Sequence, residues 1–431
     1  MKNFTKSFLV SSAVISLALV ASGCGNGNGS NSPTSASRVV YTQTNQVVGN
    51  SIYAYNQATD GKLSFMGSYG TTGKGVAEPA LAPTGVLDTD KSVIVNSAHT
   101  LLFTVNQGSD TIAVFHINGD GSLSPIQPTV PSRGKAPVSL ALIRNDSVLV
   151  CLNSSLDPSR TITDAPVYTS FRVGSDGVLT PIANSLVQLP TVAPNGNAPA
   201  PSIVLPSIDG NLIFDGNFLG DQIRVLQVDA DGVLKEALGS PHAPEDAIFT
   251  GITNPVKHCF GLGVHPTQRL LYVSYPLAKK IAIYSYDTAG ALTLVGSVSN
   301  PGRAACWIAI NKAGTRMYLT NAISGDVTVF DIGANPSLPV LLQDLNVTGT
   351  GVTLPNGNPQ VNGNPWHLTI DAREEFIYVL APRDLANTSA GQGNTIHVLK
   401  INSDGTLTEV PNSTIDMGLP IGTNPQGIGS I

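Results

Sequence analysis

Charged residues are scarce in this chain of 431 residues. They make up 12% of the sequence, about half of the usual share, which argues against long exposed helices, coiled coils and charged disordered segments. The 23 Lys and Arg, against 29 Asp and Glu, include no run that could neutralise a phosphate backbone. Nucleic acid is therefore not expected as a partner. Four Cys are too few for a disulfide scaffold.

The chain also lacks an apolar run long enough to span a bilayer. Phe8 to Val20 form an uncharged apolar run of 13 residues, whereas a spanning helix needs about 17–25. The run follows Lys2 and Lys6, which is typical of a secretory signal. It ends at Ala21-Ser22-Gly23-Cys24, which resembles the lipobox of bacterial lipoproteins, where the Cys is acylated and becomes the new N-terminus.

This resemblance implies three segments. Residues 1–23 would be a lipoprotein signal peptide and Cys24 the lipidated residue. Residues 24–37 would be a flexible tether of Gly, Ser and Asn, and residues 38–431 the folded domain. We therefore expect a monomer anchored to a membrane of the cell envelope, on its periplasmic or extracellular side. The alternative is an ordinary cleaved signal whose Cys is incidental.

Gly and Pro, by contrast, are abundant, with 43 and 30 residues, and they punctuate a repeat. An alternating strand, a tight turn and a Leu recur seven times. Asp-Gly between alternating apolar runs is a strong hairpin signal, because Gly adopts a positive φ without steric cost. The copies are IYAYNQATDGKL (52–63), IAVFHINGDGSL (112–123), VYTSFRVGSDGVL (167–179), IRVLQVDADGVL (223–234), IAIYSYDTAGAL (281–292), VTVFDIGANPSL (327–338) and IHVLKINSDGTL (396–407).

A second pair of strands precedes the hairpins. RLLYVSY (269–275) and RMYLTNA (316–322) share one pattern, and the short apolar strands FGLGV (260–264) and WIAI (307–310) stand ahead of them. Each unit therefore has four strands, which is typical of one blade of a β-propeller.

The two ends of the repeat region complement each other. Residues 39–66 contain only three strands, and residues 424–431 copy the first-strand pattern of residues 364–370. We therefore predict an all-β, seven-bladed β-propeller with four-stranded antiparallel blades, closed by the C-terminal strand that completes the N-terminal blade. An open repeat array and two smaller sandwiches are the alternatives.

This strand order predicts two different rims. With strands a, b, c and d running outward from the axis, the a–b and c–d turns share one rim, the short-turn rim. The b–c loops and the connections between blades share the other, the long-loop rim. Long loops on a rigid scaffold are where function usually sits, although these insertions could also be decoration. They are residues 70–90, 154–166, 192–201, 241–255, 346–365 and 382–394.

Six residues are candidates for a site, because they stand at or near the start of strand a and would line the channel mouth. They are Lys135, Lys257, His258, Arg303, Asn364 and His367. Three cations gathered around one mouth favour a small anionic ligand. The alternative is that the cations pair with loop acids. Those acids include Asp157, Asp164, Glu245 and Asp246.

Other chemistry finds no support in the sequence. No G-x-S-x-G nucleophile elbow is present. The seven His include no zinc spacing, so neither a metal nor a cofactor is expected. Cys151, Cys259 and Cys306 fall in predicted strands and are interpreted as small buried apolar residues.

The repeats ending in Asp-Gly-x-Leu, with a Pro-led first strand and a Tyr in the second, resemble the seven-bladed β-propeller lactonase family. That family includes propeller-type 6-phosphogluconolactonase and carboxymuconate cyclase, so the resemblance implies a lactone hydrolase. Lys257-His258 matches the basic residue and His that precede strand a in the family. The family's Asn-Glu after strand b is replaced by Tyr275-Pro276, and its Asn-Arg in the next blade by Asn321-Ala322.

Two functions stay open at this point. In a lactone (cyclic ester) hydrolase, His258 would act as base, while Lys257 and Arg303 would stabilise an oxyanion or hold a substrate anion. Lys135, Asn364 and His367 would then contact the anionic or lactone ligand. Because the family's acid and Arg are missing, the alternative is a non-catalytic ligand-binding or adhesion propeller that serves as a scaffold on the cell envelope.

Overall fold

The computed structural model of the chain describes residues 37–76, 89–347, 349, 363–383, 393–420 and 422–431. The predicted signal peptide, Cys24 and the predicted tether up to residue 36 lie outside these ranges. Within the described residues, no helix is long and apolar enough to cross a membrane.

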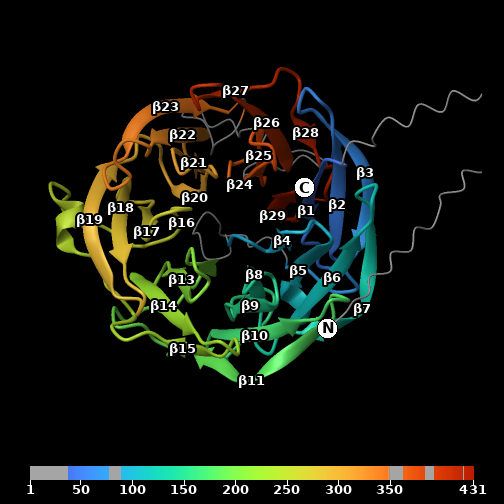
Figure 1. Cartoon of the computed structure of the whole chain (residues 1–431), viewed down its shortest axis with the longest axis horizontal. Coiled ribbons are helices and arrows are strands. Elements are labelled where there is room, and N and C mark those ends of the chain that lie inside the picture. The colour runs from blue at the N-terminus through green and yellow to red at the C-terminus, as the bar shows by residue number, and fades with distance from the viewer. Residues whose placement is uncertain (1–36, 77–88, 348, 350–362, 384–392, 421) are drawn as a thin grey trace, which may run out of the picture. The chain divides into compact units, whose positions relative to one another are not determined.

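Seven antiparallel sheets surround one axis, as predicted (Figure 1). Each sheet contributes four strands, a to d, from the axis outward, and in the seventh sheet an additional strand pairs with strand c. The prediction of a seven-bladed propeller with four-stranded blades is therefore confirmed.

The strand bounds are as follows. Blade 1 contains β29 (Gln426–Ser430), β1 (Val39–Gln43), β2 (Ser51–Gln57) and β3 (Leu63–Gly70), and blade 2 contains β4 (Val93–Val95), β5 (Leu101–Asn106), β6 (Thr111–Ile117) and β7 (Leu123–Pro131). Blade 3 contains β8 (Pro137–Ile143), β9 (Val148–Asn153), β10 (Val167–Val173) and β11 (Leu179–Gln188), and blade 4 contains β12 (Leu205–Pro206), β13 (Leu212–Asn217), β14 (Gln222–Val228) and β15 (Leu234–Glu236). Blade 5 contains β16 (Leu262–Val264), β17 (Leu270–Tyr275), β18 (Lys280–Tyr286) and β19 (Leu292–Ser299), and blade 6 contains β20 (Ala305–Ile310), β21 (Arg316–Asn321), β22 (Asp326–Asp331) and β23 (Val340–Asn346). Blade 7 contains β24 (His367–Ile370), β25 (Phe376–Ala381), β26 (Thr395–Ile401), β27 (Leu407–Glu409) and β28 (Ile415–Asp416), and the short 3-10 helices are η1 (Gln107–Ser109) and η2 (Asp246–Phe249).

The two ends of the chain close the ring. Strand β29 pairs antiparallel with β1, with Tyr41 opposite Gly429 and Thr42 opposite Ile428. The Thr42 hydroxyl also donates a hydrogen bond of 2.7 Å to the Gly427 carbonyl. The C-terminal strand is therefore strand a of blade 1, as the sequence pattern predicts, and it covers the edge that β1 would otherwise expose.

The Asp-Gly turns join strands c and d as expected. In the five copies that contain Asp-Gly, the Gly has a φ between 78° and 84°, a region that only Gly enters freely. At Gly61, a Cβ atom would also lie 2.4 Å from the Phe376 ring. The sixth copy departs from the pattern, because a longer turn through Asn335-Pro336 leaves Leu338 exposed and strand d begins at Val340.

Tyrosines of strand b connect neighbouring blades. The Tyr41 hydroxyl of blade 1 donates to the Gly121 carbonyl in the c–d turn of blade 2, at 2.7 Å. Tyr272, Tyr318 and Tyr378 make the equivalent bond to the next blade. Burial raises the pKa of Tyr318 to about 12, so its hydroxyl stays a donor at physiological pH.

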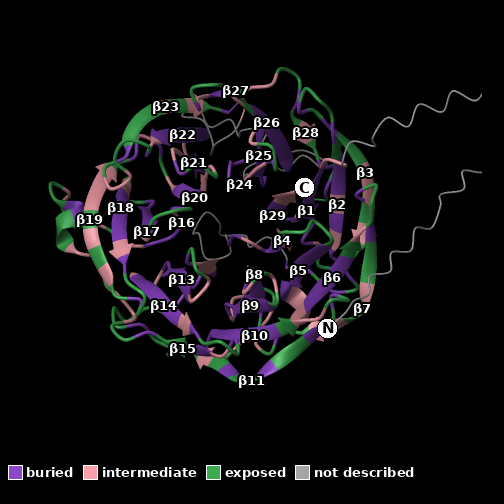
Figure 2. Ribbon diagram, viewed as in Figure 1, coloured by how far each residue is buried: buried purple, intermediate pink, exposed green. Residues whose placement is uncertain are grey.

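The core lies between the blades. Strands β5, β9 and β17 are buried along their whole length, since each is sandwiched between two neighbouring sheets. The outermost strands, such as β3 and β7, are buried only at their first residue and are otherwise exposed or half-buried (Figure 2). The ring therefore holds the start of every strand a rigidly on the long-loop rim.

We predict that Tyr378→Phe lowers the free energy of unfolding by about 1–2 kcal/mol, because the buried Gly61 carbonyl loses its donor. Tyr53→Phe is the matched control, since the Tyr53 hydroxyl makes no hydrogen bond with the described residues, and it should change stability little. Urea denaturation of both variants measures the difference. Equal stabilities would show that the blade-to-blade bond contributes nothing.

Candidate functional site

The residues just before strand a are fixed to the long-loop rim by backbone hydrogen bonds. The Ala136 carbonyl accepts from the Ser154 amide, and the Ala304 carbonyl accepts from the Ala322 amide, both within the same blade. Ala136 and Ala304 have φ values of 51° and 58°, so both starts turn sharply into their strands. His258 stands at the same position in blade 5.

His258 is oriented by a carboxylate from the neighbouring blade. Its Nδ1 lies 2.6 Å from Oδ1 of Asp221, which ends the b–c turn of blade 4 with a φ of 53°. The Phe218 ring packs against the imidazole at a centroid distance of 4.6 Å. The Nε2 atom makes no hydrogen bond with the described residues, and the side chain is 18% exposed. The pair thus presents one imidazole nitrogen to the rim.

The charge of Asp221 is stabilised where it stands. Asn195, from the insertion of residues 192–201, donates a hydrogen bond of 3.0 Å to its Oδ2. Burial acts to raise the pKa of Asp221, but the hydrogen bonds from His258 and Asn195 outweigh it and hold the pKa below its ordinary value. Asp221 is therefore an ionised acceptor for the Nδ1–H of His258 at neutral pH.

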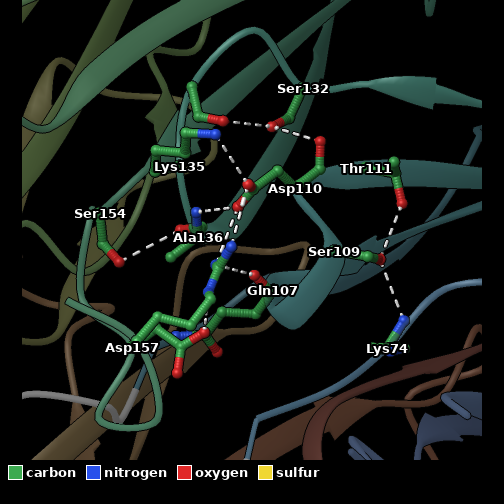
Figure 3. A network of polar contacts seen from close by, with 12 residues as sticks. Lys74, Gln107, Ser109, Asp110, Thr111, Ser132, Lys135, Ala136, Ser154 and Asp157 are labelled. Carbon is green, nitrogen blue, oxygen red and sulfur yellow. Dashed lines mark hydrogen bonds and ion pairs between the residues drawn. The ribbon is translucent and has the colours of Figure 1, made fainter. Parts of the chain in front are cut away.

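Sequence reasoning missed Asp221, although a signal for it exists. The sequence separation of Asn217 and Asp221 in blade 4 equals that of Asn106 and Asp110 in blade 2. Asp110 ends the b–c turn of blade 2 with a φ of 57°. Asp110 accepts a hydrogen bond of 2.8 Å from the backbone amide of Ala136, at the start of blade 3 (Figure 3). The same turn position therefore contacts the start of the next blade in both places.

Lys135 belongs to the ion-pair network around Asp110. Its Nζ lies 3.2 Å from Oδ2 of Asp110, whose two oxygens also accept from the Arg160 guanidinium at 2.9 and 3.0 Å (Figure 3). Arg160 bonds Asp157 as well. Lys135 of blade 3 therefore pairs with the Asp110 carboxylate of blade 2, which it shares with Arg160.

The other two cations of the predicted site have separate surroundings. The Lys257 ammonium lies 2.6 Å from Oδ1 of Asp246 and 5.7 Å from the centroid of the Phe249 ring, both in the insertion of residues 241–255. Arg303 is exposed, its amide donates to the Ser324 hydroxyl, and its side chain makes no ion pair with the described residues. No contact among the described residues joins Lys135, Lys257 and Arg303. Lys257 pairs with Asp246, one of the loop acids that the sequence suggested as partners of the cations. Lys135 pairs with Asp110, which was not among those acids.

His367, the first residue of strand a in blade 7, is fully buried beside Asp90. Its Nδ1 is 3.6 Å from Oδ1 of Asp90, and the Lys91 ammonium is 3.2 Å from Oδ2. The Asp90 amide bonds the Ser202 carbonyl of blade 4 at 3.3 Å, so the start of blade 2 reaches across the axis to blades 4 and 7. Lys91 also borders a cavity of about 380 Å³ among aliphatic strand-a side chains toward the short-turn rim. The Asp90–Lys91 segment therefore separates this cavity from the long-loop rim.

Opposing effects act on the Asp90 carboxyl. Burial alone would raise its pKa, but the Lys91 charge and the nearby His367 imidazole lower the pKa to about 2. Asp90 is therefore an ionised group in the interior at neutral pH.

A row of aromatic rings connects the two histidines. Phe218 contacts His258, Phe260 lies 5.1 Å from Phe218, and Trp307 lies 4.5 Å from Phe260, all as centroid distances. The Trp307 ring stacks nearly parallel to His367 at 6.3 Å. The region between the rim and the channel is therefore apolar and aromatic.

Two asparagines on neighbouring blades keep unused acceptors. Asn364 precedes strand a of blade 7 and Asn424 precedes strand a of blade 1, and both are at least nine-tenths buried. Among the described residues, their Oδ1 atoms have no hydrogen-bond partner, which is unusual for buried polar groups.

The described residues contain no group of three His, Cys, Asp or Glu that could hold a metal ion. Cys151, Cys259 and Cys306 are buried and form no disulfide with one another. Burial raises the pKa of the Cys151 and Cys259 thiols, so neither is a nucleophile at neutral pH.

The chain resembles known proteins in both sequence and fold. Residues 163–420 match the family described as lactonase, 7-bladed beta-propeller. The chain is similar to the 6-phosphogluconolactonase of Sodalis glossinidius (strain morsitans), with 22% identity over 267 residues that cover 58% of this chain and 67% of that protein. It is also similar to the 6-phosphogluconolactonase of Serratia proteamaculans (strain 568), with 24% identity covering 59% and 68%. The structure of a periplasmic gluconolactonase from Pseudomonas aeruginosa shares the fold, with a TM-score of 0.64 at 14% identity, covering 92% of this chain and 99% of that one.

We predict that Asp90 contributes about 2 kcal/mol to stability, since its folded pKa of about 2 lies below the ordinary 3.8. A lowered folded pKa gives stability that is present above the ordinary pKa and is lost as the pH falls toward 2. Asp90→Asn should therefore remove this part of the acid dependence. Urea denaturation between pH 7 and pH 2.5 measures it, and parallel stability curves for both proteins would contradict the buried ion pair.

Proposed function

The chain belongs to the seven-bladed β-propeller lactonase family, and from this we propose that it hydrolyses cyclic esters at the long-loop rim, with His258 as general base. The His258–Asp221 pair is the observation that carries the proposal. A carboxylate on Nδ1 keeps the proton there and leaves Nε2 as the basic nitrogen, and such a nitrogen can activate water.

The reaction then follows from the pair. The His258 Nε2 removes a proton from a water molecule as the water oxygen adds to the lactone carbonyl carbon. The tetrahedral intermediate collapses by breaking the ring C–O bond, and the leaving alkoxide takes the proton back from the imidazolium. Asp221 holds the ring in this tautomer and stabilises the imidazolium, which makes it a positioning residue. The product is a hydroxy acid.

The developing oxyanion needs a positive or donor group nearby. Of the two cations considered for this role, Lys257 bonds Asp246, whereas Arg303 makes no ion pair with the described residues. We therefore assign the role to Arg303, on the strand-a start of the neighbouring blade.

The loss of the family's Glu does not deprive His258 of a carboxylate. Tyr275 occupies the position of the Asn before that Glu, and it is buried, with its hydroxyl 3.3 Å from that of Tyr284. Asp221 reaches His258 from blade 4. The non-catalytic binding or adhesion propeller was considered because the family's acid and Arg are both missing, and Asp221 supplies a carboxylate in place of the acid. That alternative is therefore not favoured.

For the location of the protein, we propose that Cys24 is lipidated and holds the protein on a membrane of the cell envelope. The described chain begins on the short-turn rim, where the Ser37 hydroxyl bonds the Gly119 carbonyl in a c–d turn. Arg38 pairs with Glu375 in an a–b turn at 3.0 Å. A tether from Cys24 would therefore join the propeller at this rim.

We expect the purified chain to hydrolyse glucono-δ-lactone or δ-valerolactone, and His258→Ala to reduce kcat/KM by about 10²–10⁴. Asp221→Asn should lower kcat more than it changes KM, because the substrate does not touch this side chain. His116→Ala, an exposed residue of β6, is the control and should keep full activity. Acid release in a pH-stat, after correction for spontaneous hydrolysis, measures the rates. Full activity in a folded His258→Ala variant would refute the assignment.

For the anchor, Cys24→Ser should move the protein from the membrane fraction to the soluble fraction, since several acyl chains are needed for stable attachment. Immunoblotting of both fractions from cells expressing either form measures the partition. A soluble wild-type protein would show that the signal is an ordinary cleaved one.

A further inference from the structure

We infer that Asn195 is a positioning residue of the candidate site and the third member of an Asn195–Asp221–His258 array; this inference rests on the proposed hydrolase function. Asn195 acts on His258 through Asp221. The Asp221 Oδ2 accepts a hydrogen bond of 3.0 Å from the Asn195 Nδ2, while its Oδ1 lies 2.6 Å from the His258 Nδ1. Both carboxylate oxygens of Asp221 are therefore held in place, each by a residue from a different blade connection.

The hydrogen bonds of the Asn195 side chain determine the orientation of its amide. Its Oδ1 accepts from the backbone amide of Asn197 at 3.1 Å. The Nδ2 offers two N–H donors, one of which reaches Asp221, while the other reaches the Leu219 carbonyl at 2.7 Å. An amide rotated by 180° would place its oxygen against these two acceptors. Asn195 therefore presents a donor, and only a donor, to the Asp221 carboxylate.

The turn that carries Asn195 is held by its own hydrogen bonds. The Ala193 amide donates to the Asn197 carbonyl at 2.8 Å, and the Gly196 amide donates to the Ala193 carbonyl at 2.9 Å. The Asn197 side chain adds a second bond, of 3.1 Å, to the Leu219 carbonyl. The turn of residues 193–197 is thus attached to the b–c turn of blade 4, which contains both Leu219 and Asp221.

The partner that holds Asp221 from the insertion is uncharged, in contrast to the partners of Asp110. In blade 2, Asp110 pairs with two cations, Lys135 and Arg160. A cation beside Asp221 would offset the negative charge that stabilises the imidazolium of His258 during proton transfer. The amide of Asn195 orients the carboxylate without offsetting its charge.

Two other ionisable side chains interact electrostatically with Asp221, namely Lys257 and Cys259. Lys257 pairs with Asp246 at 2.6 Å. Burial raises the pKa of the Cys259 thiol, which therefore stays uncharged at neutral pH. Neither side chain bonds the Asp221 carboxylate, so the bond that fixes its direction comes from Asn195.

Asn195→Ala tests the array through the tautomer of His258. The proton of a neutral imidazole stays on the nitrogen whose N–H has a fixed acceptor. We expect the Nδ1–H tautomer in the unmodified chain and a mixture of both tautomers in the variant, because Asp221 can then turn toward water. Nitrogen-15 NMR of the His-labelled full chain at pH 8.5 measures the two populations, and the spectrum of His258→Ala assigns the signals.

In the lactonase assay, Asn195→Ala should lower kcat about 10-fold to 100-fold, as a misplaced catalytic group does, and should change KM less than twofold. Asn197→Ala is the matched control. It also removes a bond to the Leu219 carbonyl but leaves the bond to Asp221, so it should keep the tautomer and kcat of the unmodified chain. Equal melting temperatures of the two variants would show that both lose the same amount of turn stability.

Asn195→Lys tests the argument from charge, because it gives Asp221 a cationic partner like those of Asp110. The added positive charge disfavours the imidazolium and should lower the pKa of His258. The acid limb of the kcat/KM profile should therefore move to lower pH. An acid limb that stays in place would contradict the requirement for an uncharged partner.

The outcomes separate this inference from the hydrolase proposal. An unchanged tautomer and an unchanged kcat in Asn195→Ala would overturn the role of Asn195 and leave the hydrolase standing. Equal losses in Asn195→Ala and Asn197→Ala would also overturn it, since the effect would then come from the turn as a whole. If the unmodified chain hydrolyses no lactone, the hydrolase is refuted, and the tautomer populations alone decide whether Asn195 positions the pair.

Discussion

The pairing of β29 with β1 is the constraint on which the other features depend. It joins the last residues of the chain to the first strand of the domain and completes blade 1, so that all seven sheets of the ring have an innermost strand. Because the ring is closed, each blade is packed between two neighbours, and the starts of all strands a are held on one rim. The channel, the rim residues and their spacing are consequences of that closure.

Contacts between neighbouring blades position the polar side chains of the candidate site. In two places the b–c turn ends in an Asp with a left-handed backbone, and this Asp contacts the start of the next blade. At Ala136 the contact is a backbone hydrogen bond and its role is structural. At His258 the Asp at the same turn position contacts an imidazole instead, and the two residues form a histidine–carboxylate pair. One residue type at one rim position thus distinguishes a scaffold contact from a candidate catalytic base.

Most of the fold could be predicted because its determinants are local. Alternating apolar residues and Asp-Gly turns specify each hairpin, and the copy of the first-strand pattern after Asn424 specifies closure. The candidate site was less accessible, because its partners come from other blades. Asp221 lies 37 residues before His258 in sequence, and Asp90 reaches His367 only because its segment crosses the axis. The register of the repeats determines on which rim a side chain lies, but it does not determine which acid pairs with that side chain. That Lys135 and Lys257 pair with different acids is therefore seen only in the three-dimensional structure.

Native-state hydrogen exchange of the backbone amides in β1 and β29 tests the closed ring most directly. If closure holds the molecule together, these amides exchange only through global unfolding, with the same opening free energy as the buried strand β17. Rapid exchange in β29 through local detachment, while β17 remains protected, would contradict the account, since the rim would then be organised without the closing strand.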